Sequence, residues 1–454
     1  DDKQTVPSMF EPTRATVAMA KHGFVNPVVN RVTVPPFERG SATSLTSRRN
    51  LPATDGIFST TAAFALDQNT GNNDDDFDFG RSVAMTDNWA IVGASGDSFT
   101  TTNKAFVYKN TAGTWGTTAA FALDQNTGDG FFGRSVAITD NWAIVGAPDA
   151  KKAFVFKNTA GTWDTTAAFT MTVDAANFGN SVAMTDNWVI VGANFQGTAY
   201  VFKKTAAETW GTTAAFTLDQ NSGSLNFGCS VALTDNWAIV GAYTAKKAFV
   251  FKNTAGTWGT TAAFTLDRNI GDLNFGYSVS MTDNWAIVGA EGANKAFVFE
   301  NTAGTWGTTA AVALDQNTRE RMTATGTVTD GSATLITTND LSALFTAGDF
   351  VIVEHPDGGI GSDRRFTVAS DSSSTIVMTE PIDMATASLY KIYKVSNFGY
   401  SVAMTDNWAM VGASGAQKAF VFKHTSGTWG NTATFAMDQN TGDDDFGASV
   451  AVTN

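Results

Sequence analysis

Short apolar runs separated by turn residues follow one another along most of the chain, in a unit of about fifty residues. One unit holds runs at 82–85, 89–92, 105–108 and 118–123, and Asp-Asn, Gly-Ala or Asn-Thr-Ala-Gly closes the first three. Each run therefore predicts a short β-strand. The runs are apolar on both faces, whereas a sheet with one face in solvent alternates apolar and polar residues. Each predicted sheet must be covered on both sides.

The repeat is strict. All twelve tryptophans lie at two places in the unit, after Asp-Asn or after Gly-Thr (once Glu-Thr), and a Phe-Gly pair opens each unit. Such a unit buries its apolar faces only against its neighbours. The Phe-Gly pairs begin at Phe79, Phe132, Phe178, Phe227, Phe275, Phe398 and Phe446.

Radial stacking of the units covers both faces of every sheet, so the sequence predicts an all-β propeller, with a solenoid as the alternative. Six units are complete, and the seventh, 446–454, supplies one strand. Residues 58–67 match a fourth strand, while 30–36 and 41–47 resemble the missing ones. We expect a seven-bladed propeller whose last blade combines both termini, with Ser449–Val452 innermost. A longer native chain, or strands from a neighbouring subunit, are the alternatives.

One break in the phase divides the chain further. The spacing from Phe275 to Phe398 exceeds the others by about 75 residues, and the extra segment carries short alternating strands between Gly, Asp and Ser turns. It predicts an inserted small β-barrel-like domain, either a spacer or a binding element. The first residues hold six of the nine prolines and are either a disordered leader or an arm lying along an acidic propeller. The expected domains are 1–56, 57–318, 319–394 and 395–454.

The motif Phe-Gly-x-Ser-Val-Ala, followed by Val-Gly-Ala-Pro at 145–148, resembles the FG-GAP repeat of integrin α-chain propellers. The resemblance covers roughly 57–318 and 395–454. It implies a seven-bladed extracellular propeller for binding or adhesion, whose ligand face is formed by the loops after the second and fourth strands. The ligand-face residues expected on this basis are Ser95, Asp97, Lys104, Asp149, Lys151, Lys152, Phe195, Tyr243, Lys246, Lys247, Glu291, Lys295, Gln417 and Lys418.

Calcium sites of the family kind are not expected. The family's calcium loop lies between the first two strands, where this chain has only Thr-Asp-Asn in all six complete units. So short a turn cannot supply six or more oxygen ligands. Acidic turns after the fourth strands are a second candidate, although a turn held by bonds to backbone amides is favoured there. The residues concerned are Asp67, Asp124, Asn126, Asp129, Asp438, Asn440 and Asp443. No cofactor is therefore expected.

The net charge and the reactive residues of the chain limit the kinds of partner and activity that are expected. The net charge of −14 provides no basic field for nucleic acid, and no apolar stretch is long enough for direct membrane insertion. Cys229 occupies a place held by unrelated residue types in other units, so it is interpreted as a neutral substitution. None of the three histidines recurs in phase, and we expect no enzyme.

The near-identity of the units favours a scaffold, because a ligand pocket usually makes particular blades diverge. We expect a non-enzymatic extracellular structural or adhesion protein, on a cell surface or in a surface filament, that self-associates or binds another surface protein. A receptor- or carbohydrate-binding module with glycan partners is the alternative, and a glycosidase-like propeller enzyme is the third choice.

Chelation should leave the propeller folded, because the Thr-Asp-Asn turns lack the ligands for calcium. A thermal melt with and without EDTA tests this expectation. A melting temperature lowered by more than about ten degrees would contradict it, since loss of a bound ion removes its linkage stabilisation.

Overall fold

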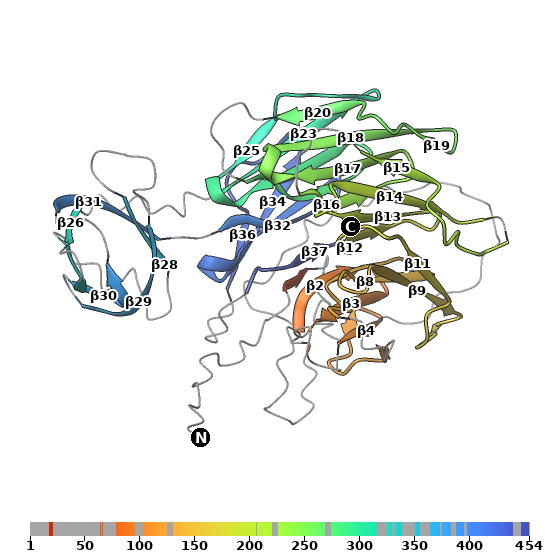
Figure 1. Ribbon diagram of the computed structural model, residues 1–454, viewed down its shortest axis with the longest axis horizontal. Coiled ribbons are helices and arrows are strands. Elements are labelled where there is room, and N and C mark those ends of the chain that lie inside the picture. The colour runs from red at the N-terminus through yellow and green to blue at the C-terminus, as the bar shows by residue number, and fades with distance from the viewer. Residues whose placement is uncertain are drawn as a thin grey trace, which may run out of the picture.

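Six antiparallel sheets, one of four strands and five of four strands with a short fifth, make a six-bladed β-propeller in the computed structural model (Figure 1). The described residues are 18–20, 64, 66, 79–95, 103–124, 130–205, 207–219, 226–267, 274–315, the strands between 325 and 394, 397–438 and 446–453. Almost no helix is present in them: three short 3-10 turns are η1 (Tyr243–Ala245), η2 (Glu291–Ala293) and η3 (Ser414–Ala416).

The first strand of each blade carries the Phe-Gly motif or follows it directly. These strands are β2 (Phe79–Met85), β7 (Ser135–Ile138), β12 (Phe178–Met184), β16 (Phe227–Leu233), β21 (Phe275–Met281) and β32 (Phe398–Met404). From β2 to β32, each contacts the first strand of the next blade, and the C-terminal strand β37 (Val450–Val452) contacts both β32 and β2. The first strands therefore surround the central axis.

The second strands begin at the tryptophan after Asp-Asn and are buried along their whole length. They are β3 (Trp89–Ala94), β8 (Trp142–Ala147), β13 (Trp188–Ala193), β17 (Trp237–Ala242), β22 (Trp285–Ala290) and β33 (Trp408–Ala413). Burial on both faces explains why these runs show no alternation of apolar and polar residues.

The third and fourth strands complete each blade outward. The third are β4 (Lys104–Thr111), β9 (Lys152–Thr159), β14 (Thr198–Lys203), β18 (Lys247–Thr254), β23 (Lys295–Thr302) and β34 (Lys418–Thr425). The fourth are β6 (Phe121–Leu123), β11 (Phe169–Thr172), β15 (Phe216–Leu218), β20 (Phe264–Asp267), β25 (Val312–Leu314) and β36 (Phe435–Asp438). Two-residue strands ending in the second tryptophan extend five third strands, namely β5 (Thr114–Trp115), β10 (Thr162–Trp163), β19 (Thr257–Trp258), β24 (Thr305–Trp306) and β35 (Thr428–Trp429).

Glycine permits adjacent blades to approach closely. A Cβ atom on Gly192 of Val-Gly-Ala would lie 2.1 Å from the carbonyl oxygen of Gly228 in the next blade. Gly228 itself has a φ of 88°, in a region that favours glycine. Its carbonyl oxygen also accepts a hydrogen bond of 2.8 Å from Ser181 Oγ. The Phe-Gly and Val-Gly-Ala motifs are therefore the two sides of one seam.

At five seams the tryptophan of a second strand packs against the second tryptophan of the next blade. Trp142 and Trp210 have ring centroids 5.8 Å apart at 88°, and four other seams repeat this edge-to-face contact. The indole nitrogen of Trp210 is buried with no hydrogen-bond acceptor. The neighbouring aromatic face is the compensation available to it. The tryptophans thus recur strictly because they make the same contact between successive blades.

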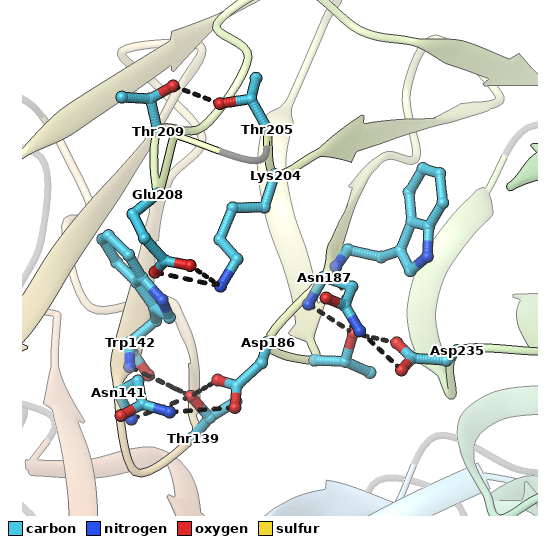
Figure 2. A network of polar contacts seen from close by, with 12 residues as sticks. Thr139, Asn141, Trp142, Asp186, Asn187, Lys204, Thr205, Glu208, Thr209 and Asp235 are labelled. Carbon is cyan, nitrogen blue, oxygen red and sulfur yellow. Dashed lines mark hydrogen bonds and ion pairs between the residues drawn. The ribbon is translucent and has the colours of Figure 1, made fainter.

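A polar ladder joins the turns between first and second strands (Figure 2). Thr139 Oγ1 and Asn141 Nδ2 donate hydrogen bonds of 2.6 and 3.0 Å to the carboxylate of Asp186 in the next blade. Asn187 and its own threonine repeat the arrangement with Asp235. The Thr-Asp-Asn turn, expected to be too short for calcium, therefore serves as an inter-blade contact.

The sequence-based prediction of seven blades is corrected to six. The last Phe-Gly unit supplies only β37 (Val450–Val452), which pairs in parallel with β1 (Ala18–Ala20) as a two-stranded sheet. A blade requires four antiparallel strands. Residues 30–36 and 41–47, expected to supply the others, lie outside the described residues, as do all but Phe64 and Leu66 of 58–67.

The β37 segment nevertheless occupies the space between the sixth and first blades. Ser449 Oγ accepts a hydrogen bond of 3.1 Å from Val83 N, and Ser401 Oγ donates one of 2.9 Å to Gly447 O. These repeat bonds found at the other seams. The C-terminal segment therefore closes the circle of first strands, as the expectation of an innermost Ser449–Val452 required.

The inserted segment contains strands that pair only with one another in the part of the chain described. They are β26 (Thr325–Val328), β27 (Ser332–Thr337), β28 (Phe350–Glu354), β29 (Arg364–Ser372), β30 (Thr375–Ile382) and β31 (Ala387–Lys394). Figure 1 shows them apart from the six blades, and their pairing order closes on itself. Register shifts interrupt three of the pairings, so the strand pairing is less regular than the sequence-based prediction of an inserted small β-barrel-like domain required. The boundaries at 319 and 394 stay predictions.

Within the described residues, no helix has the length and apolar character needed to cross a membrane.

The seam predicts the effect of one methyl group. Gly192→Ala should lower the free energy of unfolding by at least about 2 kcal/mol, because the added Cβ overlaps backbone that cannot move freely. Gly211→Ala is the control, since its Cβ would meet nothing closer than 3.5 Å. Urea unfolding followed by tryptophan fluorescence compares them, and equal stability of the two variants would contradict the close approach.

Candidate ligand-binding site

The blades share one framework, but the residue after Phe-Gly differs around the circle. We call these seven residues the inner ring: Arg81, Arg134, Asn180, Cys229, Tyr277, Tyr400 and Ala448. They lie in or beside the first strands, which surround the axis. None of the seven is classed as buried. Because the surrounding framework is uniform, the variation at the inner ring marks this end of the axis as the candidate site.

A backbone irregularity explains how the inner ring is presented. The pairing of β12 with β13 skips between Phe178 and Ser181, and Gly179 between them has a φ of 100°. A bulge of this kind adds a residue to one strand and turns its side chain away from the regular alternation. Phe178 is fully buried in the seam, whereas Asn180 is half-buried. The same skip occurs in four other blades.

Neighbouring members of the inner ring touch across the seams. Asn180 Nδ2 donates a hydrogen bond of 3.3 Å to Cys229 O. Cys229 Sγ lies 3.3 Å from Gly276 O and 3.9 Å from Tyr277 O. The rings of Tyr277 and Tyr400 are 5.2 Å apart. Half of the ring is therefore a continuous chain of contacts.

The residues after Val-Gly-Ala form a second variable set at the same end of the blades. They are Ser95, Pro148, Asn194, Tyr243, Glu291 and Ser414. An asparagine before Phe-Gly fixes several of these loops: Asn177 Nδ2 donates to Asn194 Oδ1 at 2.7 Å, and Asn274 Nδ2 donates to Glu291 Oε1 at 3.0 Å. These asparagines have φ values of 66° and 64°, which asparagine tolerates better than most residues.

Three tyrosines gather where the two sets meet. The rings of Tyr243 and Tyr277 are 5.5 Å apart at 53°, and those of Tyr277 and Tyr400 are 5.2 Å apart at 46°. Burial raises the pKa of Tyr277, with further contributions from Tyr400, Glu291 and Cys229. Burial, Cys229 and Glu291 also raise the pKa of Tyr243. Both phenols are therefore protonated at neutral pH.

The thiol of Cys229 is held in its protonated form. Enclosure of its sulfur is the main cause that raises the pKa of Cys229 to about 12, against weaker opposing hydrogen bonds from backbone groups. The thiolate is the reactive form of cysteine. Cys229 Sγ thus donates a weak hydrogen bond to the carbonyl oxygen of Gly276.

Two of the residues expected on the ligand face, Tyr243 and Glu291, adjoin the inner ring. Several others lie farther out and are locally paired, as Lys151 is with Asp174 at 2.5 Å and Lys247 is with Asp267 at 3.8 Å. The ion pair with Lys151 lowers the pKa of Asp174. Exposed pairs of this kind contribute little to stability.

The remaining predicted ligand-face residues do not converge on one place. Ser95 is buried, while Phe195 is 64% exposed and Asp149 lies beside the turn at Gly130. Asp97 lies outside the described residues. The others open the third strands or precede them: Lys104, Lys152, Lys246, Lys295, Gln417 and Lys418.

Only two of the residues expected as metal ligands in the acidic turns, Asp124 and Asp438, are among the described residues. Asp124 is half-buried after β6, and Asp438 pairs along the backbone with Lys418. In the described part of the chain, no group of three or more His, Cys, Asp or Glu side chains could hold a metal ion. The other expected ligands, Asp67, Asn126, Asp129, Asn440 and Asp443, lie outside that part.

Sequence reasoning overlooked most of the inner ring. It noted Arg81, Arg134, Asn180, Tyr277, Tyr400 and Ala448 only as residues that replace Cys229 in other units. The signal was present, because the residue after Phe-Gly differs in chemistry from unit to unit while the residues on either side of it recur. These residues become neighbours in space only because the first strands are arranged in a circle.

No family model matches the chain, and no curated protein matches it. Solved structures that resemble it include the WD40 domain of Toxoplasma gondii coronin, with a TM-score of 0.41, 8% identity and coverage of 80% of this chain and 71% of that one. A putative 6-phosphogluconolactonase from Bacteroides uniformis has a TM-score of 0.42 and 11% identity, over 80% and 98%. The periplasmic gluconolactonase of Pseudomonas aeruginosa has a TM-score of 0.42 and 10% identity, over 79% and 85%.

These likenesses are too distant to assign an activity. They do correct the expectation of a non-enzymatic extracellular structural or adhesion protein, because the similar structures named here are lactonase-like propellers and a WD40 domain. Membership of the FG-GAP family is not shown either. What stands is a six-bladed β-propeller, and the prediction that it is no enzyme is not confirmed.

The raised pKa of Cys229 predicts slow alkylation. At pH 8 a thiol with a pKa of about 12 has about a thousandfold less thiolate than an ordinary cysteine. Iodoacetamide should therefore modify the native protein about a thousandfold more slowly than the urea-unfolded protein, as followed by mass spectrometry. Similar rates in both states would contradict the enclosure of the sulfur.

Proposed function

We propose that this propeller is a binding protein for a small anionic ligand, with the inner ring as its site and Arg81 and Arg134 as its charged contacts. The observation that carries this proposal is the placement of two arginines at equivalent positions of adjacent blades, in a ring that is otherwise free of charge. A guanidinium group presents a planar fork of donors that fits carboxylate and phosphate groups.

The electrostatic setting supports an anion at this place. The chain carries a net charge of −14, so most of its surface repels anions. The adjacent arginines supply local positive charge, and the protonated phenol of Tyr277 adds no negative charge at neutral pH. Asn180 is a further neutral donor between Arg134 and Cys229 in the ring order.

Binding is better supported than acid–base catalysis. A general base requires a group that is deprotonated near the working pH. Cys229, Tyr243 and Tyr277 all have raised pKa values and stay protonated. They can donate hydrogen bonds to a bound anion but cannot take up a proton. The proposal therefore assigns no reaction to the inner ring.

Charge removal at the arginines tests the proposal. Calorimetric titration with inorganic phosphate and with benzoate should detect binding of at least one of them, weakened at least about tenfold in the double variant Arg81→Gln/Arg134→Gln, since a hydrogen bond to a charged group contributes about 1.5–3 kcal/mol. Added salt should weaken the same binding.

Lys295→Gln is the matched control, because it removes a positive charge at the start of a third strand, farther from the axis. It should leave the affinity within about twofold, as expected for a screened, distant charge. Absence of binding for both anions, or an equal loss in Lys295→Gln, would overturn the proposal.

A further inference from the structure

The tyrosine side of the inner ring has a different chemistry from the arginine side. Tyr277 and Tyr400 come from adjacent blades, and Tyr243, the first residue of η1, packs on Tyr277 from the loop. Glu291 begins η2 beside them. We call these four residues the tyrosine cluster. Aromatic faces and a carboxylate attract positive charge, whereas the arginines attract negative charge.

Glu291 forms no ion pair with the lysines and arginines of the described residues. Its carboxylate accepts a hydrogen bond of 3.0 Å from Asn274 Nδ2, and no lysine or arginine within the described residues is in ion-pair range of it. The carboxylate lies near enough to the phenols to raise the pKa of both Tyr243 and Tyr277. A negative charge is thus held next to aromatic rings, with its position fixed by Asn274.

The ring geometry decides where a cation would lie. Centroid separations of 5.2 and 5.5 Å mean that the three rings already pack against one another. A cation cannot enter between them, but all three rings are only half-buried, and an aromatic face attracts a cation within about 6 Å of its centroid. A methylated ammonium group suits half-buried rings better than a strongly hydrated inorganic ion, because it loses less hydration on binding.

We propose that the tyrosine cluster binds an organic ammonium group, so that the ligand of the inner ring is zwitterionic. The anionic half of this inference rests on the proposed function, and the cationic half rests on the tyrosine cluster. Around the ring, only Ala448 separates Tyr400 from Arg81. The smallest side chain of the ring therefore stands between the two chemistries.

Fragments of a zwitterion test the two halves separately. Tetramethylammonium, inorganic phosphate and phosphocholine are titrated into the full chain by calorimetry. Phosphocholine should bind at least about tenfold more tightly than either fragment, as expected when two linked groups occupy adjoining subsites. Sodium chloride at equal ionic strength is the reference for the ammonium compound.

Substitutions in the tyrosine cluster should act on the ammonium group alone. Tyr400→Leu should weaken tetramethylammonium and phosphocholine about five- to tenfold, whereas Tyr400→Phe keeps an aromatic face and should retain most of the affinity. Glu291→Gln should weaken both about threefold or more, since it removes one charge and keeps an acceptor for Asn274. Inorganic phosphate should bind all three variants as it binds the unaltered protein.

Glu300→Gln is the charge-matched control, because Glu300 lies on β23 in the same blade but pairs with Trp285 at the other end of the strand. An equal effect of Glu300→Gln and Glu291→Gln would overturn the inference, as would tetramethylammonium binding no better than sodium. If phosphate still binds through Arg81 and Arg134 in that case, only the ammonium subsite is refuted. If phosphate and benzoate fail as well, the proposed function falls with it.

Discussion

The close approach of two glycines across each seam is the constraint on which the rest of the molecule depends. A Cβ on the glycine of Val-Gly-Ala would lie between 1.9 and 2.2 Å from a Phe-Gly carbonyl oxygen at all six seams. No side chain fits between these backbones, so the first strands can surround a narrow axis. Farther out, where the gap between blades widens, paired tryptophans and phenylalanines fill it. The gap between blades is narrow near the axis, where glycine lies, and wide farther out, where aromatic residues fill it.

The close contact at the seam keeps some residues of the repeat the same in every blade and leaves one position between them free to vary. Phe178, Gly179 and Ser181 each have a contact to satisfy in the core or the seam. The side chain of Asn180, between them, hydrogen-bonds only to its ring neighbour Cys229 within the described residues. The residue after Phe-Gly is therefore free to differ from blade to blade without loosening the frame. The asymmetry of the inner ring, arginines on one side and tyrosines on the other, needs no change of fold.

The sequence predicted the propeller and the strand order within a blade, because tryptophan, glycine and turn residues recur in phase. It overstated the blade number, since one Phe-Gly pair predicts a first strand but says nothing of its partners, and β37 pairs in parallel with β1. The inner ring was missed for a different reason. Residues such as Arg81 and Tyr400 are more than three hundred positions apart, and only closure of the ring makes them near neighbours.

The ladder of Thr-Asp-Asn turns has a direction. At the five seams between consecutive blades the donors belong to one blade and the accepting carboxylate to the next, from Thr86 and Asp140 through to Thr282 and Asp406. Thr453 of the β37 segment donates in the same way to Asp87 of the first blade. Consecutive blades are consequently joined through the same two surfaces, with hydrogen-bond donors on one and an accepting carboxylate on the other. Any blade can then follow any other, and a duplicated or deleted repeat would still mate with its neighbours on both sides. Because the contacts between blades are equivalent, a gene of this kind can gain or lose whole repeats. Only the circumference of the propeller then has to change with the number of blades.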